Sequence, residues 1–252
     1  MKKRLAEEIF KFRHQPVAFY GTLAFVILLI YTGLNEGAAP QMLALGFGTN
    51  QWLALVLFAL SSSIFAMEYQ HGTILMLVYK SSSRLSLYLA KFLVVFLYSV
   101  LLAGISLVVT FGLKIILIGG KYSWVMPING HQSLLTALLL NLAGTLIYGL
   151  FIISLAFMLL MLVKLNVAVV GIGFAIGFIG ASLSRAFIGA FPQLSGIAKW
   201  NPLNMIFVSQ QLADPKYARL SLLSNSQIIL ATILYALLFI VIGFNLFKRR
   251  RV

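Results

Sequence analysis

The sequence predicts an all-α integral membrane protein with six transmembrane helices. The chain has 252 residues, of which 61% are hydrophobic and 10% are charged, and its mean hydropathy is +1.00. A soluble domain carries about 25% charged residues, so this composition excludes an ordinary soluble fold. Apolar segments occupy more than half of the chain, and they leave no room for a sizeable soluble domain.

Six segments have the length that a bilayer requires. A hydrocarbon core about 30 Å thick is crossed by a helix of roughly 20 apolar residues. We predict spans at residues 17–34, 50–67, 89–113, 134–162, 166–183 and 227–247 of a single membrane domain covering 1–252. The first is expected to be a retained signal-anchor, because no suitable small-residue cleavage site follows it.

The positions of lysine and arginine predict the orientation. Thirteen of the nineteen cations fall at the two termini, between the second and third spans, or between the fourth and fifth. The remaining six are Lys114, Lys121, Arg185, Lys199, Lys216 and Arg219. Since cytoplasmic loops carry the excess of positive charge, both termini are expected in the cytoplasm of a bacterial cell, with the protein in the plasma membrane. This distribution explains the formal charge of +14 without nucleic acid as a partner.

Residues 184–226 form the longest predicted external segment, yet they are rich in apolar side chains. Pro192 and Pro202 prevent one continuous helix here. Irregular backbone at membrane depth is tolerated only where protein or water surrounds it. The segment is therefore either a re-entrant hairpin ending near Trp200-Asn201-Pro202 or an amphipathic external loop.

Residues 1–16 are predicted to form an amphipathic interfacial helix. Leu5, Ile9 and Phe12 share one stripe, and most of the other side chains are polar or charged. Such a helix lies along the membrane surface with its cations toward anionic head groups. A simple positively charged anchor is the alternative interpretation.

The most informative stretch is Glu68-Tyr-Gln-His-Gly72-Thr73, followed by Ser83-Arg84 and Lys91. Glu68 can pair with Arg84 or Lys80, Gly72 can supply a tight turn, and Thr73 can cap a short helix. This pattern resembles the cytoplasmic loop of six-helix ABC-2 type permeases, roughly E-x-x-x-G-T, then S-R and K. Many relatives have a proline before Ser-Arg, whereas this chain has Lys80-Ser81-Ser82.

The resemblance implies a permease subunit that forms half of a transmembrane path in an ATP-driven exporter. It implies a short cytoplasmic coupling helix that docks on a separate ABC ATPase, present in two copies, and a second identical or homologous permease. Residues implied in coupling are Glu68, Gly72, Thr73, Lys80, Arg84 and Lys91. ATP and Mg belong to the partner, and no cofactor is expected in this chain. Short relatives often export peptides or other amphiphiles.

Within the spans the candidates are polar or small. Ser62, Tyr98, Asn141 and Tyr148 are candidates to line a path, although hydrogen bonding between helices is the commoner use of such residues. Gly173 and Gly177 have the four-residue spacing that allows close helix packing. Lys91, Lys114 and Lys164 lie near predicted span ends, where their long stems can reach water.

Catalytic classes find no support in the sequence. His14, His71 and His131 lack metal-ligand spacing, no P-loop is present, and there is no cysteine. We therefore expect a transport subunit and neither an enzyme nor a metal site. Two alternatives remain open, namely an ATP-independent immunity or peptide-binding module and a secondary transporter. The second is weakened because no ionisable residue lies at mid-depth of a predicted span.

Overall fold

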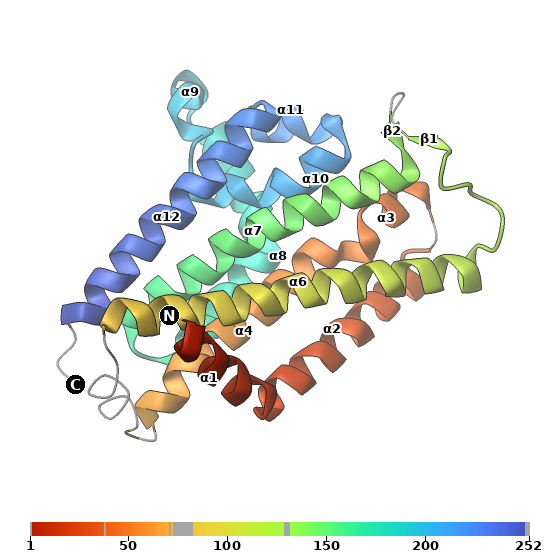
Figure 1. Cartoon of the computed structure of the whole chain (residues 1–252). Coiled ribbons are helices and arrows are strands. Elements are labelled where there is room, and N and C mark those ends of the chain that lie inside the picture. Colours follow the sequence, from red (N-terminus) through yellow and green to blue (C-terminus); the bar gives the residue numbers. More distant parts are fainter. Residues whose placement is uncertain (1, 38, 71, 73–82, 129–131, 250–252) are drawn as a thin grey trace.

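The computed structural model describes residues 2–37, 39–70, 72, 83–128 and 132–249. It is almost entirely helical (Figure 1). Its described strands, β1 (Pro127–Ile128) and β2 (Gln132–Ser133), have two residues each and pair antiparallel. Six described helices are long and apolar enough to cross a membrane. The predicted class, an all-α integral membrane protein, is confirmed.

The long helices contain the predicted spans. They are α2 (Pro16–Asn35), α4 (Thr49–Gln70), α6 (Arg84–Leu117), α7 (Leu134–Val163), α8 (Asn166–Ala190) and α12 (Asn225–Arg249), and α1 (Lys2–Arg13) precedes them. Local signals set several ends. Pro16 begins α2, and the hydroxyls of Ser83 and Ser133 accept backbone N–H bonds that cap α6 and α7. Lys164 ends α7 with a left-handed φ of 65°.

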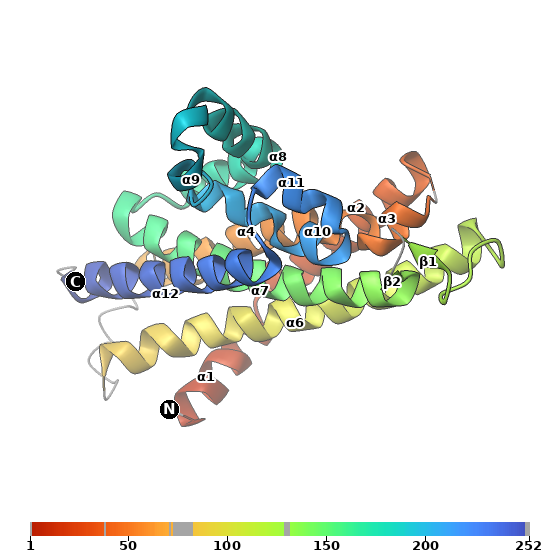
Figure 2. The same cartoon turned by 90° about the horizontal axis from the view of Figure 1, so that it is seen from above.

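Helices α4 and α7 form the centre of the bundle. Burial within the protein reaches 72% along the span of α4 and 61% along α7, against 22% for α2 and α8 and 28% for α12. In Figure 1 α7 lies between α12 and α6 and α2 lies at the lower edge of the bundle, and in Figure 2 α8 lies at the upper edge. The peripheral helices expose apolar side chains, as expected for helices that face lipid.

Short elements fill the connections. Between α2 and α4 the chain forms α3 (Pro40–Ala44) and the 3₁₀ turn η1 (Gly46–Gly48). After α8 it forms η2 (Pro192–Leu194), α9 (Ser195–Ala198), η3 (Pro202–Phe207), α10 (Val208–Ala213), η4 (Pro215–Tyr217) and α11 (Ala218–Ser221). Proline begins four of these elements, where its missing N–H costs nothing.

The segment after α8 folds back onto the bundle. Helix α10 packs against α7, and η3 packs against α8 and α12. Asn204 is fully buried and donates to the carbonyls of Lys199 (2.6 Å) and Ser221 (2.8 Å). Asn201 caps η3 and also donates to the Ser184 hydroxyl at 3.1 Å. These bonds satisfy irregular backbone inside the protein, which is the condition for such backbone at membrane depth.

Candidate functional site

A buried ammonium group joins three helices at the end of the bundle where the N-terminus lies. Lys91 of α6 is only 2% exposed. Its Nζ lies 2.8 Å from Oε2 of Glu8 in α1 and 2.6 Å from Oε1 of Glu68 in α4. The sequence predicted that Lys91 would reach water beyond its span. That expectation was wrong, because α1 folds over the end of α6 and supplies a carboxylate instead.

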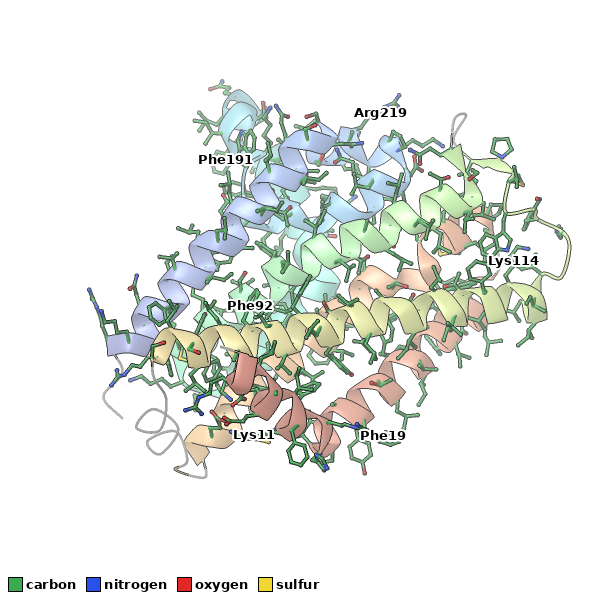
Figure 3. The ribbon with its side chains drawn as sticks, viewed as in Figure 1. Lys11, Phe19, Phe92, Lys114, Phe191 and Arg219 are labelled. Atoms are coloured by element: carbon green, nitrogen blue, oxygen red, sulfur yellow. The ribbon has the colours of Figure 1, made fainter. Side chains whose placement is uncertain are left out.

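Lys11 completes a set of two carboxylates and two ammonium groups, here called the charge cluster (Glu8, Lys11, Glu68 and Lys91). Its Nζ lies 3.2 Å from Glu8 Oε1 and 3.7 Å from Glu68 Oε1. Opposite charges balance within the cluster, so each buried carboxylate has a cationic partner. Figure 3 labels Lys11 beside α1, and Lys114 at the far end of α6.

The protonation of Glu8 follows from this balance. Burial alone raises the pKa of the carboxyl group, but attraction and hydrogen bonds from Lys91 and then Lys11 outweigh it. The pKa of Glu8 is therefore lowered from its ordinary value, and the group is ionised at neutral pH.

Further contacts fix α1 against the spans. Phe12 packs edge-on against Tyr98 of α6, with ring centroids 5.2 Å apart. The Tyr98 hydroxyl bonds to the Ala18 carbonyl (2.9 Å) and to the Thr22 hydroxyl (2.8 Å) of α2. Glu8 and Phe12 are four residues apart and share the face of α1 that meets the protein. The apolar stripe predicted here therefore includes a carboxylate, which hydrophobicity alone does not indicate.

The other predicted coupling residues lie near the charge cluster or outside the described part. Glu68 pairs with Lys91 and Lys11, whereas Arg84 donates from Nη1 to the Lys248 carbonyl at 2.6 Å. Gly72 is exposed and has a φ of 64°, a conformation that suits a glycine turn. Thr73, Lys80 and the proposed coupling helix lie outside the described residues.

The predicted path residues are all buried. Ser62 bonds to the Phe58 carbonyl within α4, and Tyr98 bonds to α2 as described above. Tyr148 is 1% exposed and stacks on Phe151. Asn141 alone of the four borders a polar cavity at the opposite end of the bundle.

The two glycines predicted to mediate packing lie against α4. A Cβ at Gly173 would fall 2.4 Å from Phe58 Cγ, and one at Gly177 would fall 2.7 Å from Leu55 Cδ2. Close approach of α8 and α4 therefore requires glycine at position 173, whereas at position 177 a larger residue would require the end of the Leu55 side chain to shift. This contact lies within one chain.

The two other lysines predicted near span ends differ in their exposure. Lys164 is exposed, but Lys114 is 7% exposed and lies over the Trp124 ring at 5.0 Å from the centroid. Over the part of the chain that the structure describes, no group of three or more histidines or acidic residues could hold a metal ion.

Six described helices that are long and apolar enough to cross a membrane define a multi-pass membrane protein. A family model described as ABC-2 family transporter protein matches residues 5–186. The chain therefore belongs to the ABC-2 transporter family, as its loop motif predicted, and is a permease-type transport subunit. Permeases of this family generally work with an ABC ATPase. No curated protein matches the sequence.

Proposed function

We propose that this chain is the permease subunit of an ATP-driven exporter, in which two permeases form the path and two ABC ATPase copies bind at the charge-cluster end. Its cargo is an amphipathic peptide, toxin or other small amphiphile. The observation that carries this proposal is the buried Lys91, which ties α1 to the ends of α4 and α6 on either side of the predicted docking loop.

The cluster gives a mechanical route for coupling. The segment that joins α4 to α6 starts after Gln70 and stops before Arg84. A partner that pushes on this loop acts on both helix ends at once. Glu68 and Lys91 lie just inside those ends and Lys91 also holds Glu8, so α1 moves with them. Buried ion pairs are suited to holding such a register, because breaking one leaves an uncompensated charge.

An apolar groove supports an amphiphilic cargo. It lies between α2, α4 and α8, has a volume of about 580 Å³, and is lined by residues including Val17, Tyr20, Val56, Phe174 and Phe178. It accepts the apolar part of a molecule that enters from the bilayer. The two helices on its sides, α2 and α8, are the least covered of the six spans.

Orientation is tested by labelling single cysteines. The chain contains no cysteine, so one introduced thiol is the only reactive one. In intact cells a membrane-impermeant maleimide should label Lys216→Cys and should label Gly72→Cys only after the membrane is opened. The reverse pattern would overturn the cytoplasmic placement of the termini.

Coupling is tested on the complex in proteoliposomes. Glu68→Ala and Arg84→Glu should abolish the cargo-stimulated part of ATP hydrolysis while membrane insertion persists. Lys114→Met is the control, because it removes a buried charged group at the other end of the bundle. Full stimulation in both test variants would remove the coupling role from this end of the protein.

A further inference from the structure

An apolar pocket lies where the segment after α8 meets α12. It has a volume of about 490 Å³, and its wall comes from the end of α8, η2, α9 and α12. Figure 3 labels one wall residue, Phe191, beside this segment. The large side chains of the wall are Phe187, Phe191, Leu194, Ile197, Trp200 and Tyr235. None of them belongs to the charge cluster or to the apolar groove between α2, α4 and α8.

The polar side chains of Tyr235 and Asn201 on this wall are already hydrogen-bonded. The Tyr235 hydroxyl donates to the Trp200 carbonyl at 2.6 Å. The amide of Asn201 donates to the Ala198 carbonyl at 2.9 Å and accepts from the backbone N–H of Asn204 at 3.1 Å. Since a polar ligand would lose its own hydrogen bonds to water on entering such a pocket, the wall favours a hydrocarbon chain.

The pocket continues the apolar surfaces of two peripheral helices. Phe178 and Leu183 are exposed on α8 before the pocket, and Leu234 and Leu238 are exposed on α12 on either side of Tyr235. The spans of α8 and α12 are only 22% and 28% buried within the protein. A lipid chain that lies against these helices can therefore enter the pocket without leaving an apolar environment.

The segment that forms most of the wall carries unpaired positive charge. Residues 184–226 contain Arg185, Lys199, Lys216 and Arg219 but only one acidic residue, Asp214, so their net charge is +3. None of these four cations forms an ion pair within the part of the chain that the structure describes. Asp214 instead accepts from the backbone N–H of Lys216 at 3.0 Å. The segment therefore favours an anionic partner.

Two of these cations adjoin the pocket wall along the chain. Arg185 is two residues before Phe187, and Lys199 directly precedes Trp200. Arg185 is also nineteen residues after Asn166, where α8 begins at the charge-cluster end, which is about 28 Å at 1.5 Å per residue. The hydrocarbon core is about 30 Å thick, so Arg185 reaches the head groups of the leaflet opposite to the charge cluster.

We propose that this pocket holds an acyl chain of an anionic phospholipid, whose phosphate lies against Arg185 and Lys199. Such a lipid presents a hydrocarbon chain and a negative head group together, as the wall and the unpaired cations require. Trp200 and Tyr235 are the residue types that proteins place where these two parts of a lipid meet. The inference goes beyond the proposed function, because this lipid holds the segment after α8 and is not the cargo.

Brominated lipids test this site, because bromine on an acyl chain quenches a tryptophan that it touches. The permease alone is reconstituted in phosphatidylcholine vesicles with a small fraction of chain-brominated phosphatidylglycerol or chain-brominated phosphatidylcholine. Trp200 is the reporter on the pocket wall. Trp200→Phe keeps an aromatic wall, and the quenching that it loses is the share due to Trp200.

Brominated phosphatidylglycerol should quench Trp200 as strongly as about fivefold more brominated phosphatidylcholine, the enrichment expected from one lysine or arginine near an anionic head group. Arg185→Gln with Lys199→Gln should remove this preference. Both side chains lack an ion pair, so this variant should fold. Lys216→Gln with Arg219→Gln is the matched control, because it removes the same charge from residues that do not line the pocket, and it should keep the preference.

Equal quenching by the two lipids in the wild type, or an equal loss of preference in the two double variants, overturns the assignment. Absence of Trp200 quenching by either lipid also overturns it and leaves the pocket to another occupant. No ATPase is present, and both leaflets contain the brominated lipid, so the result depends neither on transport nor on orientation. Failure of this test therefore leaves the proposed function standing, and loss of coupling in the earlier assay leaves this site standing.

Discussion

Replacement of Lys91 by methionine removes the centre of the charge cluster without removing its volume. In the wild type the ammonium group forms ion pairs of 2.8 Å with Glu8 and 2.6 Å with Glu68. The variant leaves these two carboxylates with Lys11 as their remaining partner. The Lys11 side chain is 41% exposed, and its Nζ lies 3.2 Å from Glu8 Oε1 and 3.7 Å from Glu68 Oε1. Loss of one partner of a buried ion pair costs about 3–5 kcal/mol. We expect the lower end, about 3 kcal/mol, because Lys11 compensates in part.

The matched variant Lys114→Met sets the scale. Lys114 has no ion pair among the described residues and contacts the Trp124 ring, an interaction that contributes about 0.5–1 kcal/mol. Unfolding in mixed micelles with increasing dodecyl sulfate measures both variants. Equal losses of stability in Lys91→Met and Lys114→Met would contradict the predicted contribution of the two ion pairs of Lys91.

A variant without the buried charges of the charge cluster distinguishes a structural role of the cluster from a role in coupling. Glu8→Leu, Glu68→Leu and Lys91→Met together remove three of the four charges of the cluster, and replacing a buried ion set by apolar residues of similar volume is often neutral for stability. The triple variant should therefore recover most of the stability that Lys91→Met loses. If it also restores cargo-stimulated ATP hydrolysis, the charge cluster is only a structural contact.

Three further predictions concern acid, helix packing and the segment after α8. Because the pKa of Glu8 is lowered in the folded protein, its contribution to stability is complete above the ordinary value of 4.5 and is lost as the pH falls through the folded value. The melting temperature should therefore fall as the pH is lowered below 4.5, and less steeply in Glu8→Gln. Gly173→Ala should cost about 1–3 kcal/mol by overpacking against Phe58, whereas Gly171→Ala, which meets nothing within 4 Å, should not destabilise; equal stabilities would contradict the packing. Asn204→Leu should cost about 2–3 kcal/mol by stranding two buried carbonyls and should open residues 184–226 to protease, with Asn35→Leu as the exposed control; unchanged protease resistance would argue against this role of Asn204.

The six long helices were predictable because length and hydropathy determine them almost alone. Each predicted range lies within one helix, and the ends differ where capping decides them. The third span was predicted from residue 89 but its helix begins at Arg84, because the Ser83 hydroxyl accepts from Ser86 N and caps it. Proline positions likewise predicted breaks after α8, and Asn201-Pro202 begins η3.

The charge cluster was only half predictable. Glu68 and Lys91 were singled out by the loop motif, but Glu68 was expected to pair with nearby Arg84 or Lys80 or with the ATPase. Glu8 is 83 positions from Lys91, and no periodic pattern links residues so distant. A local signal did exist, since Lys91 falls four residues after Leu87 and four before Val95, both fully buried. A lysine within an apolar helical face needs a carboxylate, and the chain has only five acidic residues to supply one.

Whether an ABC ATPase accompanies this chain decides between the proposed transporter and a binding module that acts alone. The protein is purified from its native membrane in several mild detergents, and the amount of bound P-loop ATPase is measured per permease. We predict that a stoichiometric ATPase copurifies with the wild type and with Lys114→Met. In Lys91→Met, the ATP hydrolysis of the complex should no longer respond to cargo. Absence of any associated ATPase in every detergent would contradict the account and favour an ATP-independent peptide-binding module.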